Sequence, residues 1–250
     1  MSRFVIDAAE LNPALKALAP ITRGVVKGEP ETAGVCEMVY CRTTTSGELL
    51  MATADLTNKL VAAVTVPLID FDGELAEFAI GREKLKQITA IFKPDEEANK
   101  PVVVEVTRNK VPLRGVEQVI TMTEGEIDQS PSSLSFAGAK WEDLPWRETL
   151  KSISHNPLAT QQPIEGYISP TAWAKLQAAT KTYGVSAMTT VSGAALILLG
   201  ERMIAILGAK WEQENPPKKQ HQAIQNAAAA VGATAELIEG TDPIDLQQAA

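Results

Sequence analysis

The chain has 250 residues, a formal net charge of -8, 45% hydrophobic residues and 22% charged residues. These values are typical of a soluble globular protein with one large domain or two of ordinary size. Only 5% of the residues are aromatic, which leaves few rings on which single-stranded nucleic acid could stack. The longest apolar region, residues 194–209, is interrupted at 200–202, so it indicates two buried strands and not a bilayer span.

The N-terminus and the cysteines indicate in which cellular compartment the protein acts. No long apolar run follows Arg3, so we do not expect a secretory signal. Cys36 and Cys41 fall at odd spacing in one predicted strand and face opposite sides, which argues against a disulfide and, without a nearby histidine, against a zinc site. We therefore expect a cytoplasmic protein.

The first half of the chain predicts the same series of elements twice. A strand at 4–7 precedes a helix at 8–19 that Asp7 can cap, and strands follow at 35–43, 48–54 and 59–66. A second strand at 77–80 then precedes a helix at 82–93. Three short strands follow, at 102–107, 111–115 and 118–123, with a turn at 108–110. Two passes of strand, helix and three strands indicate an internal structural repeat.

The helix that we read at about 81–93 has one basic face. At 100° per residue, Arg82, Lys86 and Lys93 fall within about 40° of one another, and Leu85 and Ile88 lie on the opposite arc. A basic helical face on an acidic chain suggests that the protein meets a polyanion through one chosen surface.

The second half begins after a polar segment rich in serine and glycine at 124–138. Beyond it we predict a helix at 145–153, a strand at 166–169, a helix at 170–183 that starts with Pro170, and strands at 185–192, 194–199 and 203–209. A helix at 220–231 and a loose tail would end the chain. The predicted domains are 1–125, with two modules, 126–212, partly degenerate, and 213–250.

Three stretches resemble the bacterial beta clamp of DNA replication. FVIDAAELNPALKAL (4–18) is similar to its opening strand and first helix. LLMATADLTNKLVAAVTVP (49–67) resembles the strand that ends in a Thr-Asp-Leu-like turn and the aliphatic strand after it. FAIGREKLKQITAIF (78–92) resembles the second strand-helix unit. The resemblance covers residues 3–123, is weaker over 165–210 and does not reach the tail.

The resemblance implies an α+β fold of repeated strand-helix-three-strand modules, with helices on one face of antiparallel sheets. Clamps are closed rings whose helices line the hole. Two-domain clamps close as trimers and three-domain clamps as dimers, so this length favours a homotrimer. The implied function is that of a ring-forming processivity factor that encircles duplex DNA and tethers a replicative polymerase. The implied partners are double-stranded DNA, the polymerase and a clamp loader, the last two through short apolar peptides, in a bacterial cell or a phage-infected host.

A ring around DNA needs positive charge that faces phosphates without reading bases. Every predicted helix before the tail carries a basic residue off its apolar stripe. The candidate DNA-binding residues on these helices and the nearby loop are Lys16, Arg23, Lys27, Arg82, Lys86, Lys93, Arg147, Lys151, Lys175 and Lys181.

The sequence argues against an enzyme. It has no phosphate-binding glycine loop and no nucleophile elbow, and its two histidines, His155 and His221, have no nucleophile or metal ligand at a suitable spacing. The carboxylates at 95–97 fit a solvated loop, and Asp55 fits a turn better than a catalytic site. We expect no catalytic residue, no metal, no cofactor and no membrane contact.

Two alternatives stay open at this point. The chain could be a clamp-fold interaction module, or a decoy for clamp partners, that does not encircle DNA. It could also be an unrelated α+β enzyme whose site is not visible in the sequence.

Overall fold

The computed structural model describes residues 1–22, 38–95, 100–111, 115–125, 132–138, 168–191 and 194–208. The chain divides into two compact units. The first consists of Met1–Thr53 with Val64–Glu142, and the second of Ala54–Ala63 with Asp143–Ala250. The predicted boundaries at 125 and 212 remain predictions.

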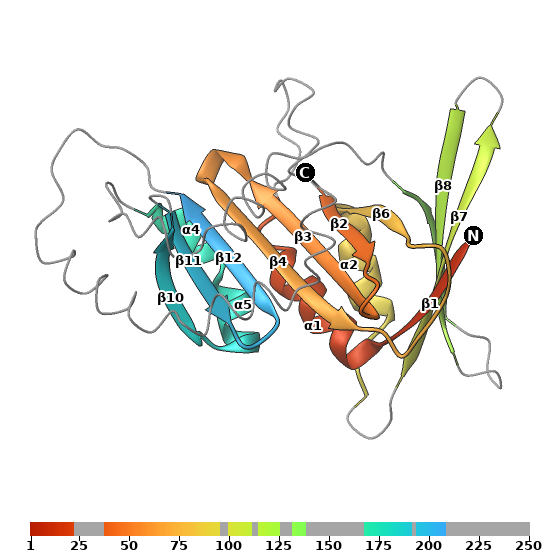
Figure 1. Ribbon diagram of the computed structural model, residues 1–250, viewed down its shortest axis with the longest axis horizontal. Helices are drawn as coiled ribbons and strands as arrows, with labels where there is room; N and C mark the ends of the chain where they lie inside the picture. The colour runs from red at the N-terminus through yellow and green to blue at the C-terminus, as the bar shows by residue number, and fades with distance from the viewer. Residues whose placement is uncertain are drawn as a thin grey trace, which may run out of the picture. The chain divides into compact units, whose positions relative to one another are not determined.

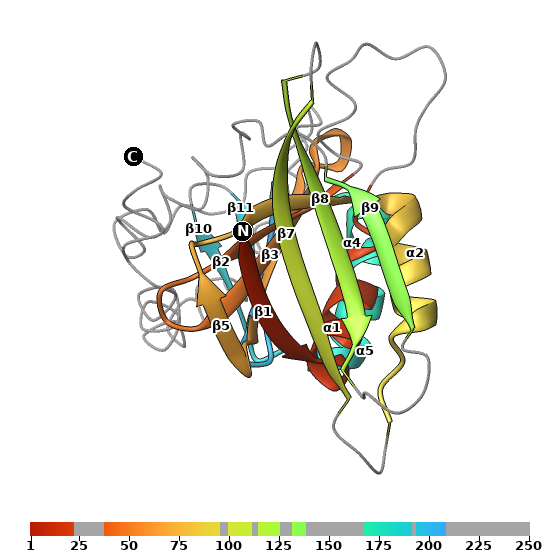
Figure 2. The ribbon, with the colours of Figure 1, turned by 90° about the vertical axis from the view of Figure 1, so that its right-hand side faces the viewer.

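The described part of the first unit contains two helices and strands of two antiparallel sheets (Figure 1). Its elements are β1 (Ser2–Asp7), α1 (Ala8–Leu18), β2 (Met38–Thr43), β3 (Glu48–Asp55), β4 (Leu60–Pro67), β5 (Asp70–Gly73), β6 (Glu77–Gly81), α2 (Arg82–Ile91), β7 (Pro101–Val111), β8 (Gly115–Glu124) and β9 (Ser133–Ala137). The end of β3, from Ala54, and the start of β4, up to Ala63, belong to the second unit. One sheet has the order β5-β1-β7-β8-β9, shown side by side in Figure 2, and the other runs β4-β3-β2-β6.

The two modules of this unit exchange their first strands. β1 pairs antiparallel with β7 of the second module, and β6 pairs antiparallel with β2 of the first. The exchange brings Phe4 of β1 and Phe78 of β6 together in the core, where the two buried rings stack with centroids 6.1 Å apart. Both helices lie on the same side of β2 and β3 (Figures 1 and 2). The predicted α+β fold of repeated strand-helix-three-strand modules is confirmed.

The second module has three strands after its helix, but they differ from the three that we predicted. The predicted turn at 108–110 is wrong, because β7 runs on to Val111 and pairs with β8 from Val102 to Val111. The third strand is β9, inside the polar segment at 124–138 that we expected to separate the two halves of the chain. Its serines made it look like a loop, but Leu134 and Phe136 alternate with smaller residues, and Phe136 is buried against the sheet.

The second unit holds η2 (Leu56–Asn58), α4 (Pro170–Lys175), α5 (Gln177–Tyr183), β10 (Ala187–Val191), β11 (Ala194–Leu199) and β12 (Met203–Gly208). The three strands form an antiparallel meander in which Gly200, at φ 61°, makes the β11–β12 turn. The Gly208 N–H donates to the Lys59 carbonyl at 2.7 Å, so the start of β4 continues this sheet beyond β12.

The helix predicted at 170–183 is two short helices. α4 ends before Leu176, whose N–H donates to the carbonyl of Trp173, three residues back, instead of continuing the α-helical ladder. α5 then ends at Tyr183 and is followed by Gly184, which has φ 72°. Of the strand predicted just before, residues 168 and 169 are described and are not in a strand. The predicted helices at 145–153 and 220–231 lie outside the described residues.

Candidate nucleic-acid interface

The described helices carry a charge opposite in sign to that of the whole chain. α1, α2, α4 and α5 together hold six basic side chains and two acidic ones, whereas the chain holds 23 basic and 31 acidic residues. The basic residues are Lys16, Arg82, Lys84, Lys86, Lys175 and Lys181, and the acidic ones are Glu10 and Glu83. The excess of carboxylates therefore belongs to the rest of the chain.

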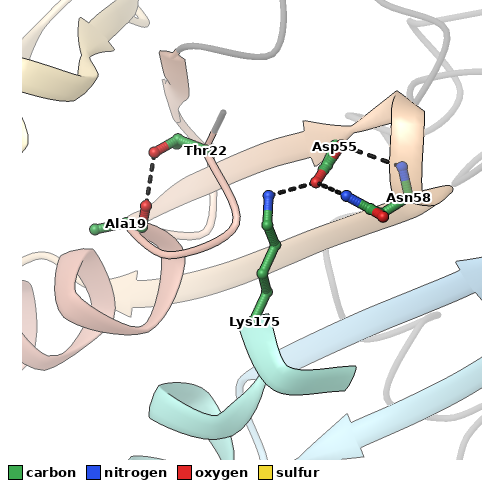
Figure 3. Close-up of polar contacts among 5 residues, drawn as sticks. All are labelled: Ala19, Thr22, Asp55, Asn58 and Lys175. Atoms are coloured by element: carbon green, nitrogen blue, oxygen red, sulfur yellow. Dashed lines mark hydrogen bonds and ion pairs between the residues drawn. The ribbon is translucent and has the colours of Figure 1, made fainter. Parts of the chain in front are cut away.

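Lys16 lies on the narrow exposed stripe of α1. Asp7 starts this helix, because its Oδ1 accepts a hydrogen bond from the Ala9 N–H at 2.8 Å, as the sequence predicts. At the other end the Thr22 hydroxyl donates to the Ala19 carbonyl at 2.7 Å (Figure 3). Most of α1 is buried, but Lys16 is exposed in the last turn, where the helix dipole favours a cation.

α2 presents its basic residues away from its buried face. Leu85 and Ile88 are buried, Lys86 is exposed and Arg82 is half-buried in the first turn. Lys84, which our prediction did not include, is half-buried and donates to Gln87 Oε1 at 3.0 Å. Its place in the first turn of a basic helix was visible in the sequence.

Lys93 is not on the predicted helical stripe. α2 ends at Ile91, and Phe92 has left the helical conformation with φ -91° and ψ 73°. Pro94 explains the early end, because proline disfavours the helical conformation in the residue before it. Lys93 is exposed just beyond the helix, so it remains close in sequence to the α2 cations without sharing their face.

Asn12 joins the two helices of the first unit. Its side-chain Nδ2 donates to the Phe92 carbonyl at 2.7 Å and to the Thr89 carbonyl at 2.9 Å. These carbonyls belong to the end of α2, where the last turn lacks partners within the helix. Asn12 is buried, and a polar residue on an otherwise apolar stripe is the signal that sequence reasoning missed.

Lys175 is held by a buried carboxylate in the second unit. Its Nζ donates to Asp55 Oδ2, and the Asn58 side-chain amide donates to the same oxygen at 2.7 Å (Figure 3). The Asn58 backbone N–H donates to Asp55 Oδ1 at 3.2 Å, which closes the turn after β3. The side chain of Asp55 is 1% exposed and that of Lys175 is 21% exposed. The interpretation of Asp55 as a turn residue is confirmed.

The pKa of Asp55 lies below its usual range. Burial alone would raise this pKa, because it disfavours the carboxylate form. The hydrogen bonds from Lys175 and Asn58, together with the charge of Lys175, outweigh burial and lower it. The ion pair therefore exists at neutral pH, and Lys175 serves to anchor α4.

The remaining predicted cations divide into two groups. Lys181 is exposed on α5, and no acidic residue occurs in α4 or α5. Arg23, Lys27, Arg147 and Lys151 lie outside the described residues. Lys16, Arg82, Lys86 and Lys181 are therefore the predicted cations that lie on described helices and are not paired with a carboxylate in the described part of the chain.

Among the described residues, no group of His, Cys, Asp and Glu could hold a metal ion. None of the described helices is long and apolar enough to cross a membrane. Cys41 is buried in β2, and burial raises the pKa of its thiol above its usual range.

No model of a known protein family matches the sequence, and no curated protein matches it in sequence. Solved structures do match its fold. The DNA polymerase III beta subunit of Thermotoga maritima superposes with a TM-score of 0.54 at 10% identity, over 88% of this chain and 67% of that one. The beta sliding clamp of C. crescentus gives a TM-score of 0.54 at 12% identity, over 88% and 67% of the two chains.

The DNA polymerase sliding clamp of Pseudomonas aeruginosa gives the same TM-score of 0.54 at 13% identity, again over 88% of this chain and 67% of that one. At such identities the likeness concerns the fold alone. The chain has the sliding-clamp fold, as the sequence resemblance implied, and it spans about two thirds of the length of these clamps.

Proposed function

We propose that this chain is a DNA sliding clamp, a ring-forming processivity factor that encircles duplex DNA and tethers a replicative polymerase. The supporting observation is the reversal of charge on the helices of a clamp-fold protein: six basic residues against two acidic ones, in a chain of net charge -8. Within the described residues, this reversal makes the helices a surface that attracts phosphates.

The chemistry proposed for this face is attraction without sequence readout. Exposed Lys16, Lys86 and Lys181 can exchange phosphate partners while the protein moves along the duplex, because each contact is weak and screened by salt. Topological linkage would then supply the residence time. Lys175 is left out of the proposed interface, because Asp55 already holds its ammonium group. Arg23, Lys27, Lys93, Arg147 and Lys151 stay in the proposal as sequence predictions.

Ring closure would join free sheet edges of neighbouring copies. Among the described strands, β9 ends its sheet in the first unit and β10 ends the meander in the second, and pairing would satisfy the open hydrogen-bonding groups of such edges. A homotrimer is the proposed assembly, with the polymerase and a clamp loader as partners that bind through short apolar peptides. No catalytic step is assigned, and the proposed place of action is the cytoplasm of a bacterium or of a phage-infected host.

Two measurements test the proposal. Sedimentation at micromolar concentration should give three times the 26.8 kDa mass of the chain. Retention on nicked circular DNA should exceed retention on the same DNA after linearisation, because a ring can slide off free ends. A trimer held equally on both DNA forms would contradict encirclement.

A matched pair of variants locates the interface. Lys86→Glu on α2 and Arg108→Glu on β7 reverse one exposed basic residue each. Lys86→Glu should lower DNA affinity and reduce the salt slope by about two, since it removes one phosphate contact and adds a repulsion. Arg108→Glu should change both much less. Equal losses in the two variants would overturn a helix-specific interface.

A second candidate is a clamp-fold interaction module that does not encircle DNA. Within the described residues, the second unit shows only one set of a helical segment and three strands, whereas the first unit shows two sets. A monomer at micromolar concentration that binds circular and linear DNA equally, or not at all, would favour this candidate.

A further inference from the structure

The outer edge of the five-stranded sheet differs in character from the helices. β5 is the last strand of that sheet and, among the described strands, pairs only with β1. In the register of this pair Asp72 lies opposite Arg3 and Phe71 opposite Phe4. The other side of β5 has no strand neighbour in the described part of the chain, so its backbone groups on that side are open to a further strand.

The residues of this edge alternate between acidic and apolar. Asp70, Asp72 and Glu74 occupy every second position of the stretch LIDFDGELA. Side chains at every second position of an extended strand share one face, so the carboxylates of Asp70 and Asp72 point to the same side. Glu74 follows directly after the strand. Asp72 and Glu74 are exposed. Asp70 Oδ1 accepts a hydrogen bond from the Phe71 N–H at 3.0 Å, its Oδ2 lies 3.5 Å from Arg3, and its side chain is 62% exposed.

The positions in between form an apolar face. Phe71 is half-buried over Phe4, which directs these positions toward the core side of the sheet. Ile69 and Leu75 lie just before and just after β5 and are 59% and 36% exposed, and Met1, whose carbonyl lies against Gly73, is 74% exposed. Half of the large exposed hydrophobic residues in the described part of the chain therefore lie along this short edge.

We infer that the β5 edge is a docking site for an extended peptide segment of a protein partner, in which basic residues alternate with aliphatic ones. A strand added beside β5 gains main-chain hydrogen bonds. It places its alternate side chains on the two faces of the sheet, one set on the side of Asp70 and Asp72 and the other on the side of Phe71, with Ile69 and Leu75 exposed at the two ends of the strand. Three carboxylates within five residues favour lysine and arginine on the first face and repel nucleic acid from this edge.

The occupant is a protein segment because both chemistries are needed together. A phosphate-rich ligand would be repelled by Asp72 and Glu74, and a purely apolar peptide would leave the carboxylates without a partner. A second copy of β5 would bring like charges face to face, which disfavours pairing between two identical edges. This inference does not depend on the proposed DNA function.

The test uses the full chain and a labelled nonapeptide in which five lysines alternate with four valines. A control peptide has the same composition, with the lysines and valines in separate blocks. Fluorescence anisotropy should show saturable binding of the alternating peptide at least about tenfold tighter than that of the block peptide, because only alternation matches both faces. A third peptide, N-methylated at alternate positions along one edge, should lose this binding, since it cannot form the strand ladder.

Variants of the protein assign the site. Asp72→Lys combined with Glu74→Lys should weaken binding of the alternating peptide about tenfold or more. Glu83→Lys, which reverses an exposed carboxylate on α2, should leave binding unchanged. Both variants alter exposed side chains, and unchanged near-ultraviolet circular dichroism confirms that the fold is kept.

Several results would overturn the inference. Equal binding of alternating and block peptides would reduce the edge to a nonspecific acidic patch. An absence of saturable binding would leave the carboxylates the sole role of keeping a free edge from aggregating. Tight binding that survives N-methylation, or that Glu83→Lys weakens as much as the β5 variant does, would place the peptide elsewhere. None of these results bears on ring formation or DNA retention.

Discussion

Both units hold a helix in place with a buried polar side chain, but the two contacts differ in kind. In the first unit a neutral amide, Asn12, donates to two carbonyls at the end of α2. In the second unit a charged pair, Lys175 and Asp55, ties α4 to the turn after β3. The first contact needs only hydrogen-bond geometry, whereas the second also depends on protonation. The difference shows that the two helix positions should respond differently to substitution and to pH.

Breaking the charged contact should have the largest effect. Lys175→Met leaves the Asp55 carboxylate buried without its counter-charge, which should lower the free energy of unfolding by about 3 kcal/mol. Chemical denaturation measures this loss in the free energy of unfolding. Asp55→Asn should cost less, because Lys175 is partly exposed and can turn its ammonium group to water. Equal losses in the two variants would contradict the asymmetry.

Breaking the neutral contact should cost somewhat less. Asn12→Leu keeps a side chain of similar size but leaves the carbonyls of Thr89 and Phe92 without their donor. We expect a loss of about 2 kcal/mol in the free energy of unfolding. Hydrogen exchange should become faster in the last turn of α2 and remain unchanged in α5, and a loss confined to α5 would contradict the assignment.

A fall in pH should weaken the Lys175–Asp55 contact and leave the Asn12 contact unchanged. The folded pKa of Asp55 is lowered, so its contribution to stability is fully present above the unfolded pKa and disappears as the pH falls through the folded value. Between about pH 5 and pH 2 the wild type should therefore lose more stability than Asp55→Asn, up to about 1.4 kcal/mol per pH unit. Asn12→Leu should keep the wild-type pH dependence, and parallel curves for wild type and Asp55→Asn would refute the ionic role.

The smallest effect on stability is expected for Lys181, which lies in the same unit as Lys175. Lys181→Gln removes an exposed charge on α5 and should change the free energy of unfolding by less than about 0.5 kcal/mol. It should nevertheless reduce the salt slope of DNA binding by about one. An unchanged salt slope would remove Lys181 from the interface and leave α4 and α5 without a described DNA contact.

The elements with a strong local pattern could be predicted. α1 begins at Ala8 and is capped by Asp7 as expected, and the first module has its strands within a few residues of the predicted bounds. β5 and β9 were missed because charged or small polar residues occupy half of their positions, which hides the alternation of an edge strand.

The site was less predictable than the fold, because its contacts join distant parts of the chain. Lys175 and Asp55 are 120 residues apart, and Asn12 and Phe92 are 80 apart. The helical periodicity placed Lys175 off the apolar stripe of its helix, but it carried no information about the Asp55 carboxylate that binds it. Lys93 was misplaced for a local reason, since Pro94 ends the helix before it.

The exchange of first strands between the two modules of the first unit constrains how the polypeptide reaches its native state. β1 cannot complete its pairing until β7 has been synthesised, about a hundred residues later in the register that joins Ser2 to Val106. Contacts of such sequence separation are slow to form. On the ribosome, the first module alone would therefore expose an incomplete sheet. The whole of this unit should emerge before it becomes resistant to proteolysis.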